Sequence, residues 1–249
     1  MNSAPLKCFK ADLHIHSCLS PCGDWGMSPK RIVEKSLEKG LDIIAICDHN
    51  TAENAEATMR AGEKKGVYVF PGMEICSREE VHIVALFDRL EQAMAMQEYV
   101  YAQLEGENQP EVFGDQVIVD ENDEVLDENH RLLIGATRLG LHEIVEKIHF
   151  LRGLGIASHV DRPSFGIISQ LGFIPPDLKL DGIEVSYHMS PKEAPEKIPE
   201  SKNLPCVTSS DAHFQDDIGK VWTVFRLAAA TLEEIHLAFQ GKGGRRIEV

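Results

Sequence analysis

The chain has 249 residues, of which 43% are hydrophobic and 26% are charged, which is enough to bury the core of one large α/β domain. Its formal net charge of −15 argues against tight, nonspecific binding of long duplex nucleic acid, which needs a basic surface. A small phosphorylated substrate is compatible with this charge, because bound metal ions can supply positive charge locally.

The sequence predicts a protein without a membrane partner. No apolar run approaches the roughly 20 residues that span a bilayer, and the chain does not begin with a basic segment followed by an apolar one. The six cysteines are scattered, which is typical of thiols in a reducing compartment and predicts a cytoplasmic location. Cys18 and Cys22 stand apart, because they lie close to the histidine pair described next.

The first predicted strand, a short apolar run over residues 6–13, ends in His14 and His16. In an extended strand, residues i and i+2 point to the same face, so the two imidazoles can converge on one ion. A pair of histidines with a purely structural role is the alternative. The residues that follow decide between the two.

The remaining elements follow from hydrophobic periodicity and from helix start and stop signals. Ser28 and Pro29 open the first helix, Gly66 closes the second, and Thr231 with Glu234 forms a capping box for the last. Helices are predicted over residues 28–40, 52–65, 89–105, 141–152, 164–171 and 231–241. Strands are predicted over residues 41–47, 67–70, 81–87, 156–159, 182–186, 206–209 and 220–225.

Residues 106–138 break this alternation. Short apolar runs at 117–119 and 125–126 flank an acidic turn, which predicts a small β-hairpin inserted at the surface. The turn lacks the glycine and the regular ligand series of a calcium loop, so we interpret it as solvated.

Strands that alternate with helices predict a parallel sheet, as a barrel or as a doubly wound fold. The candidate functional side chains follow at least five different predicted strands. Only a closed or nearly closed barrel brings so many strand ends around one mouth, so we expect a TIM-like barrel. His82 fits less well, because it lies near the start of its apolar run. Either that strand begins later or it runs in the opposite direction.

Six short motifs occur in one order along residues 12–213: DLHIHS, CDHNT, GME, VHI, ASH and SSDAH. This series resembles the PHP (polymerase and histidinol phosphatase) superfamily of metal-dependent phosphoesterases. The resemblance implies a distorted (β/α)7 barrel that holds two to three divalent metals, and it covers nearly the whole chain. We therefore expect residues 1–249 to form a single PHP-type domain.

Carried onto this sequence, the resemblance implies three metal positions. The first would be held by His14, His16, Glu74 and Asp211. Glu74 would bridge to a second metal, which His82 and His159 complete. His49 and His213 would bind a third. The family usually has one more ligand in the loop after the histidine pair, where Pro21 cannot bind a metal through its side chain. Asp24 is our choice for that ligand, and Cys22 is the second choice.

Mixed imidazole and carboxylate ligands suit Zn, Mn or Fe(II). Two such ions roughly 3.5–4 Å apart can clamp a phosphoryl oxygen and generate a hydroxide nucleophile at neutral pH. Glu74 and Asp211 would be the catalytic carboxylates that position these ions. Asp12 and Asp48 are candidates for hydrogen bonds to the ring N–H groups, or for caps at strand ends.

Three further residues are candidates for substrate contact. Arg162 follows His159 on the same loop and could hold a phosphate in two-pronged fashion, with a surface ion pair as the alternative. His188 follows the strand over 182–186 and could protonate a leaving group, or it is an exposed loop residue. Lys220 is the weakest of the three.

These observations leave three hypotheses for function. The first is hydrolysis of a small phosphomonoester, such as a nucleotide or an amino-alcohol phosphate. The second is a phosphodiesterase or exonuclease that trims short oligonucleotide ends. The third is a noncatalytic, metal-stabilised module. The acidic balance favours the first, and hydrolysis of another bond, such as an amide, is also open.

Overall fold

A computed structural model describes residues 5–248. Its strands are β1 (Lys7–Ile15), β2 (Ile43–Ile46), β3 (Tyr68–Cys76), β4 (His82–Leu86), β5 (Val117–Val119), β6 (Val125–Glu128), β7 (Leu154–Ala157), β8 (Gly182–Val185), β9 (Cys206–Thr208), β10 (Thr223–Leu227) and β11 (Arg246–Glu248). Its α-helices are α1 (Pro29–Glu38), α2 (Ala55–Lys65), α3 (Leu90–Tyr101), α4 (Pro110–Phe113), α5 (Leu141–Phe150), α6 (Ile167–Leu171), α7 (Ala194–Lys197) and α8 (Leu232–Phe239). Short 3₁₀ helices are η1 (Pro199–Asn203), η2 (Gln215–Asp217) and η3 (Lys242–Gly244).

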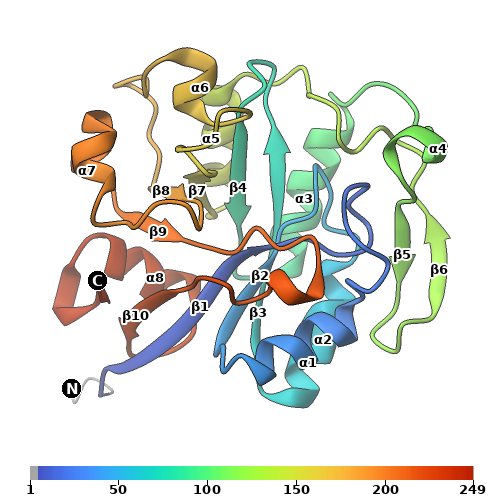
Figure 1. Ribbon diagram of the computed structural model, residues 1–249, viewed down its shortest axis with the longest axis horizontal. Coiled ribbons are helices and arrows are strands. Elements are labelled where there is room, and N and C mark those ends of the chain that lie inside the picture. Colours follow the sequence, from blue (N-terminus) through green and yellow to red (C-terminus); the bar gives the residue numbers. More distant parts are fainter. Residues whose placement is uncertain (1–4, 249) are drawn as a thin grey trace.

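Nine strands form one sheet in the order β11-β10-β1-β2-β3-β4-β7-β8-β9 (Figure 1). Neighbours pair in parallel from β1 to β3 and from β7 to β9. Four pairings are antiparallel: β10 runs opposite to its neighbours β1 and β11, and β4 runs opposite to its neighbours β3 and β7. The reversal of β4 explains why His82 stands at the start of its strand: the first residue of β4 lies opposite Cys76, near the end of β3.

The two ends of the sheet approach each other without a full ladder. The amide of Thr208 on β9 donates to the Thr223 hydroxyl of β10 at 2.9 Å, and that hydroxyl donates back to the Thr208 carbonyl. Beyond β9, the His16 amide donates to the Ala212 carbonyl at 3.0 Å. The result is a distorted, nearly closed barrel, and the expected fold is confirmed.

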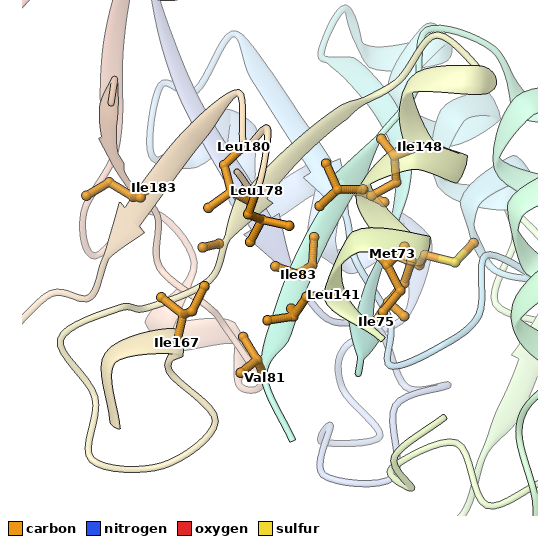
Figure 2. Close-up of a cluster of buried hydrophobic side chains, with 14 of the residues drawn as sticks. Met73, Ile75, Val81, Ile83, Leu141, Ile148, Ile167, Leu178, Leu180 and Ile183 are labelled. Atoms are coloured by element: carbon orange, nitrogen blue, oxygen red, sulfur yellow. The ribbon is translucent and has the colours of Figure 1, made fainter. Parts of the chain in front are cut away.

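Buried aliphatic side chains fill the space between the sheet and its helices. The largest cluster joins β3 and β4 to α5, and Figure 2 shows Met73 and Ile83 on these strands with Ile148 on the helix. A second cluster, which includes Leu13 and Phe225, packs α8 against β1 and β10. Because both clusters are closely packed, they hold the strands rigidly and give the side chains at the strand ends fixed positions.

The third strand is longer than its sequence pattern predicts. We expected it to end at Phe70 and to be followed by Glu74, but β3 continues to Cys76 through Pro71 and Gly72. A Cβ atom on Gly72 would lie 2.6 Å from the carbonyl oxygen of Ala85. A turn-forming Pro-Gly pair therefore serves here to bring β4 close, and Glu74 lies inside a strand.

The predicted surface hairpin is present as the two-stranded sheet of β5 and β6, at the right edge of Figure 1. Asn54 anchors it, since its side chain donates to the Val117 carbonyl and accepts from the Val119 amide. Cys18 packs against both valines. Burial raises the pKa of its thiol to about 12, which indicates a packing role.

Two predicted caps differ in detail. Ser28 is the N-cap of α1, but its side chain makes no capping hydrogen bond. Thr231 caps α8 by accepting from the Glu234 amide, yet the Glu234 carboxylate accepts from the amide of Ala228 and pairs with Arg245. The capping box is therefore only half formed. Within residues 5–248, no helix is long and apolar enough to cross a membrane.

Candidate metal centre

The end of β1 places His14 and His16 side by side in the interior. Both residues are fully buried, and their Nε2 atoms lie 3.1 Å apart. The spacing predicted from an extended strand is therefore observed, and both rings face the same point at the mouth of the barrel.

Glu184 on β8 orients the ring of His14. Its carboxylate accepts from His14 Nδ1 at 3.0 Å and from the His159 amide at 3.2 Å. Glu184 is 2% exposed, and the sequence reasoning assigned it no role. The available signal was a lone carboxylate within an otherwise apolar strand, which needs a buried partner.

Ser20 orients the ring of His16. The Ser20 hydroxyl lies 2.9 Å from His16 Nδ1 and donates its own proton to Asp48 at 2.7 Å. It must therefore accept a hydrogen bond from Nδ1–H, which leaves His16 Nε2 with a free lone pair. Asp48 thus acts on a ring through Ser20, and the expected direct contact is absent.

Asp12 does not contact a ring either. It is fully buried and accepts from the amides of Ser210 and Gly219 at 2.9 and 3.0 Å. Burial raises its pKa to about 6, although these hydrogen bonds oppose the rise. The strand-end alternative is the one observed, and Asp12 ties the loop that carries Asp211 to β1.

Two carboxylates lie beside the two Nε2 atoms, so that four electron-rich groups meet. Asp211 Oδ1 lies 3.1 Å from His16 Nε2 and 3.4 Å from His14 Nε2, and Glu74 lies 3.4 Å from the latter. Glu184 and Ser20 accept the hydrogen bonds from the two Nδ1–H groups. The Nε2 lone pairs therefore face the two carboxylates, and these four acceptors need a cation between them. The set His14, His16, Glu74 and Asp211 therefore fits a divalent metal.

The charges in this cluster shift the pKa values of its members. Burial alone would lower the pKa of His14, but Glu184, Glu74 and Asp211 outweigh it and raise that pKa well above the usual value. Burial would raise the pKa of Asp211, but His14 and His16 hold it well below its usual range. Burial lowers the pKa of His16 to about 3, so this imidazole is neutral and ready to bind a metal.

Two further groups overlap the first. Glu74 joins His49 and His82 in one of them, and His16 joins His49 and His213 in the other, with the ligand atoms of each group within 4.8 Å of one another. Glu74 therefore belongs to two groups, as expected of a bridging carboxylate. His159 approaches the same carboxylate, with Nε2 3.2 Å from Glu74 Oε1.

Unsatisfied polar atoms accompany these groups. His159 Nδ1 is buried without a hydrogen-bond partner, and His82 Nδ1 and Asp211 Oδ1 are buried with only close contacts, to Glu74 at 3.0 Å and to His16 at 3.1 Å, that lack hydrogen-bond geometry. Such atoms are costly unless a ligand satisfies them. His159 and Asp211 also have positive φ angles of 28° and 50°, a backbone conformation that L-residues rarely adopt and that clusters at functional sites.

The loop after β1 does not place Asp24 among these ligands. Asp24 is exposed, and its Oδ1 accepts from the Gly26 amide at 2.7 Å. Its backbone amide donates to the His213 carbonyl, so the loop lies beside the centre. Burial raises the pKa of the Cys22 thiol to about 12, and the charges of Glu74 and Asp211 add to the rise. Either residue as a ligand stays a prediction.

A small cavity of about 180 Å³ opens over the cluster. Its lining residues are His49, Glu74, His82, Ile134, His159, Arg162, Ser164, Phe165, Asp211 and His213. Arg162 points into the centre, with Nη1 2.5 Å from Asp211 Oδ2. His188 is exposed and lies in a separate hollow with Lys220, so the structure does not bring it to this cavity.

Comparison with known proteins agrees with this site. The PHP domain matches residues 12–170, and a PHP-associated segment matches residues 196–240. The chain therefore belongs to the PHP domain family, a superfamily of metal-dependent phosphoesterases.

Particular relatives place the chain within that family. It is 30% identical to an uncharacterized protein of Methanocaldococcus jannaschii, over 72% of this chain and 83% of that protein. It is 34% identical to a 5'-3' exoribonuclease of Haemophilus influenzae, over 32% of this chain and 30% of the relative.

Solved structures share the fold at low sequence identity. A lesion-specific endonuclease, EndoQ, from Pyrococcus furiosus superposes with a TM-score of 0.74 at 22% identity, covering 97% of this chain and 58% of that one. A complex of Endonuclease Q with a 27-mer duplex that carries an abasic lesion superposes with a TM-score of 0.68 at 21% identity, with the same coverage. This chain thus spans less than two thirds of the exoribonuclease and of the endonucleases.

Proposed function

We propose that this protein hydrolyses the phosphate ester of a small phosphorylated molecule, such as a nucleotide or an amino-alcohol phosphate. The supporting observation is the cavity of about 180 Å³, which joins the buried ligand cluster to the guanidinium of Arg162. A space of this size suits a phosphoryl group and a short part of its leaving group. The acidic exterior agrees with a small substrate.

In this proposal, two or three ions of Zn, Mn or Fe would be held by His14, His16, His49, Glu74, His82, His159, Asp211 and His213. Bound ions would polarise the phosphoryl oxygens and lower the pKa of a water nucleophile to near 7. Glu184 and Ser20 fix the tautomers of His14 and His16, so that each presents Nε2 to the centre.

Arg162 would bind the phosphoryl group. Its contact with Asp211 already directs the guanidinium toward the centre, and 30% of its side chain is exposed. The oxygens of a phosphate can accept hydrogen bonds from the remaining N–H groups of Arg162 without breaking that contact. Phe165, which stacks on His82 at 4.6 Å, covers one wall and limits the access of water. His188 as the acid for the leaving group stays a prediction.

The second candidate is hydrolysis of the phosphodiester at a short, single-stranded oligonucleotide end. The exoribonuclease relative and the endonuclease fold support it. The same metal-ligand cluster could serve either ester, because both reactions attack a phosphorus atom held by the same oxygens. The part of the surface that binds the leaving group separates them.

The test is phosphate release by the metal-loaded protein. A panel of mononucleotides, sugar phosphates and amino-alcohol phosphates is assayed beside end-labelled oligonucleotides, each with Zn, Mn and Fe(II). Turnover of a small ester alone supports the first candidate, and shortening of labelled strands supports the second. If no substrate is turned over by protein that contains two or more metal equivalents, both fail and the noncatalytic module is favoured.

Asp211→Asn provides the matched variant. It keeps the size of the side chain but removes the charge that faces His14 and His16, so turnover should fall at least about 100-fold. Asp216→Asn is the control, because the Asp216 side chain is 98% exposed. Intact turnover in Asp211→Asn would contradict the proposed mechanism.

A further inference from the structure

A groove follows the incomplete seam of the barrel, where β9 approaches β10. Two hollows of about 410 and 290 Å³ share Ser190, Pro191, Thr208 and Trp222, and therefore form one continuous groove. One wall comes from the segment after β8 and the other from the segment that leads into β10. The sheet leaves this seam unpaired except for the contact between Thr208 and Thr223.

The walls of the groove combine exposed aromatic rings with lysines. Tyr187 is 41% exposed and Trp222 is 39% exposed. The ammonium of Lys220 lies 4.4 Å from the centre of the Tyr187 ring, and that of Lys10 lies 5.0 Å from the Trp222 ring. Rings that carry a cation on one side can stack a planar base on the other. Aromatic faces beside basic groups are the usual means of binding a single strand without reading its sequence.

The local charge contrasts with that of the molecule. The chain carries a net charge of −15, yet Lys10, Lys192 and Lys220 lie along this groove. Each carboxylate along it is paired with a cation: Asp217 lies 3.5 Å from Lys220, Glu193 accepts from the Ser190 amide at 3.0 Å and pairs with Lys197, and Glu248 at the far end pairs with Arg246. An anionic occupant with flat rings is therefore favoured over an acidic peptide, whose side chains offer nothing for the two rings to stack on.

Residues that line the groove lie next to residues of the metal centre, in space or along the chain. On one side, Ser186 donates from its amide and hydroxyl to Asp161, the neighbour of Arg162. On the other side, Thr208 on the floor precedes Asp211 by three residues, which span at most about 11 Å of chain. The groove and the metal centre are therefore lined by adjoining segments of the chain.

We propose that this groove binds a single-stranded nucleic acid, with bases stacked on Tyr187 and Trp222 and phosphates beside Lys10 and Lys220, and that it delivers the strand end to the metal centre. The inference rests on the proposed phosphoesterase function. It adds single-strand ends, the second candidate above, to the small esters that the cavity admits, and it gives a role to the segment that contains His188.

Binding and hydrolysis are measured separately. Fluorescein-labelled single strands of 2–12 nucleotides are titrated with the full chain in chelator, so that no strand is cut, and anisotropy is recorded. Affinity should rise with strand length and fall with salt. The double variant Tyr187→Ala/Trp222→Ala should bind at least about 100-fold more weakly, at roughly tenfold for each ring. Its hydrolysis of bis-p-nitrophenyl phosphate, which is too small to reach the groove, should change less than twofold.

Phe150→Ala is the matched control. Phe150 is 78% exposed and also has a lysine over its ring, Lys147 at 5.1 Å, but it lies on α5 outside the groove. An equal loss of strand affinity in Phe150→Ala and in the double variant would overturn the proposal. Wild-type affinity in the double variant would overturn it as well. Hydrolysis of the small diester without any strand binding would leave the phosphoesterase function standing and remove the groove. Strand binding without hydrolysis of any ester would leave the groove standing and remove the phosphoesterase function.

Discussion

The contact between Glu184 and His14 shows how a residue away from the reacting atoms can set the chemistry of the site. Glu184 fixes which nitrogen of His14 carries the proton, and its charge makes that ring more basic. A ligand of this kind binds a metal more tightly once its proton has been displaced.

Glu184→Gln should weaken metal binding by about 10–100-fold, because the amide keeps a hydrogen bond but loses the charge. The measurement is competition with a chromogenic chelator at pH 7.5. Glu193→Gln is the control, since the Glu193 side chain is 46% exposed and contacts Lys197 and the Ser190 amide, away from the metal centre. Unchanged affinity in Glu184→Gln would mean that Glu184 serves packing alone.

His149 on α5 provides a test of pH dependence away from the metal centre. Its hydrogen bond to Asp181, at 2.8 Å, raises its pKa above the usual 6.5. The folded state therefore holds this proton more tightly than the unfolded chain. The stabilisation is fully present below pH 6.5 and is lost as pH rises through the folded pKa.

His149→Gln should therefore lower the free energy of unfolding more at pH 5.5 than at pH 9, by about half a kcal/mol, because the site is partly exposed and screened. Urea unfolding of the metal-free protein measures both values. His142→Gln on the same helix is the control, since its partner Asp177 is exposed. An equal loss of unfolding free energy at both pH values would contradict a stabilising role for the proton of His149.

The ligands that could be predicted from sequence were those whose position follows from chain direction. His14 and His16 stand where an apolar strand ends, so their convergence needed only the period of a strand. Glu184 could not be found in this way, because its partners lie on β1 and after β7. Asp48 shows the same limit: its distance from a ring depends on the path of a loop, which sequence periodicity does not describe.

The hairpin of β3 and β4 is the element on which the expected alternation fails. A βαβ rhythm predicts parallel neighbours, but β3 passes straight into β4 through a short turn and reverses direction. Only a hairpin lets Glu74 and His82 reach the mouth from successive strands. The apolar pattern of each strand is the same for either direction, so the sequence left the orientation of β4 open.

Gly72→Ala should destabilise the protein by about 2 kcal/mol, because the new Cβ would lie 2.6 Å from the Ala85 carbonyl and push β4 away from β3. Chemical denaturation measures the loss. Gly155→Ala on β7 is the control, since its Cβ would meet Ile148 at an ordinary 3.5 Å. Equal stability of the two variants would show that the hairpin can relax.

The molecule as a whole collects its ligands from both ends of the chain. The nine-stranded sheet takes in both β1 and β11, whereas β5 and β6 form a separate sheet. That residues 1–249 form a single domain stays a prediction. The candidate ligands His14 and Asp211 meet only when the barrel is assembled. Any ion that binds them binds the folded state alone, so metal binding and folding must be linked.

Saturation with Zn or Mn at about 1,000 times the Kd should stabilise the folded state by about 4 kcal/mol. For a domain of this size, that corresponds to a rise in Tm of roughly 8–16 °C over the chelated protein. Differential scanning calorimetry measures it. Glu74→Gln, which alters two ligand groups at once, should lose most of the rise. An equal Tm with and without metal would argue against the cluster as a metal centre.

The hairpin of β3 and β4 also has a consequence for folding, because the parts of the metal centre can form in a definite order. Glu74 and His82 belong to adjoining strands joined by a short turn, so their approach closes only a small loop. Asp12 and Ser210, which bring Asp211 to β1, are 198 residues apart. Loop closure is slower for such distant segments. We therefore expect a nascent chain to acquire a weak, partial ion site around the hairpin first, and the complete centre only when the last strands arrive.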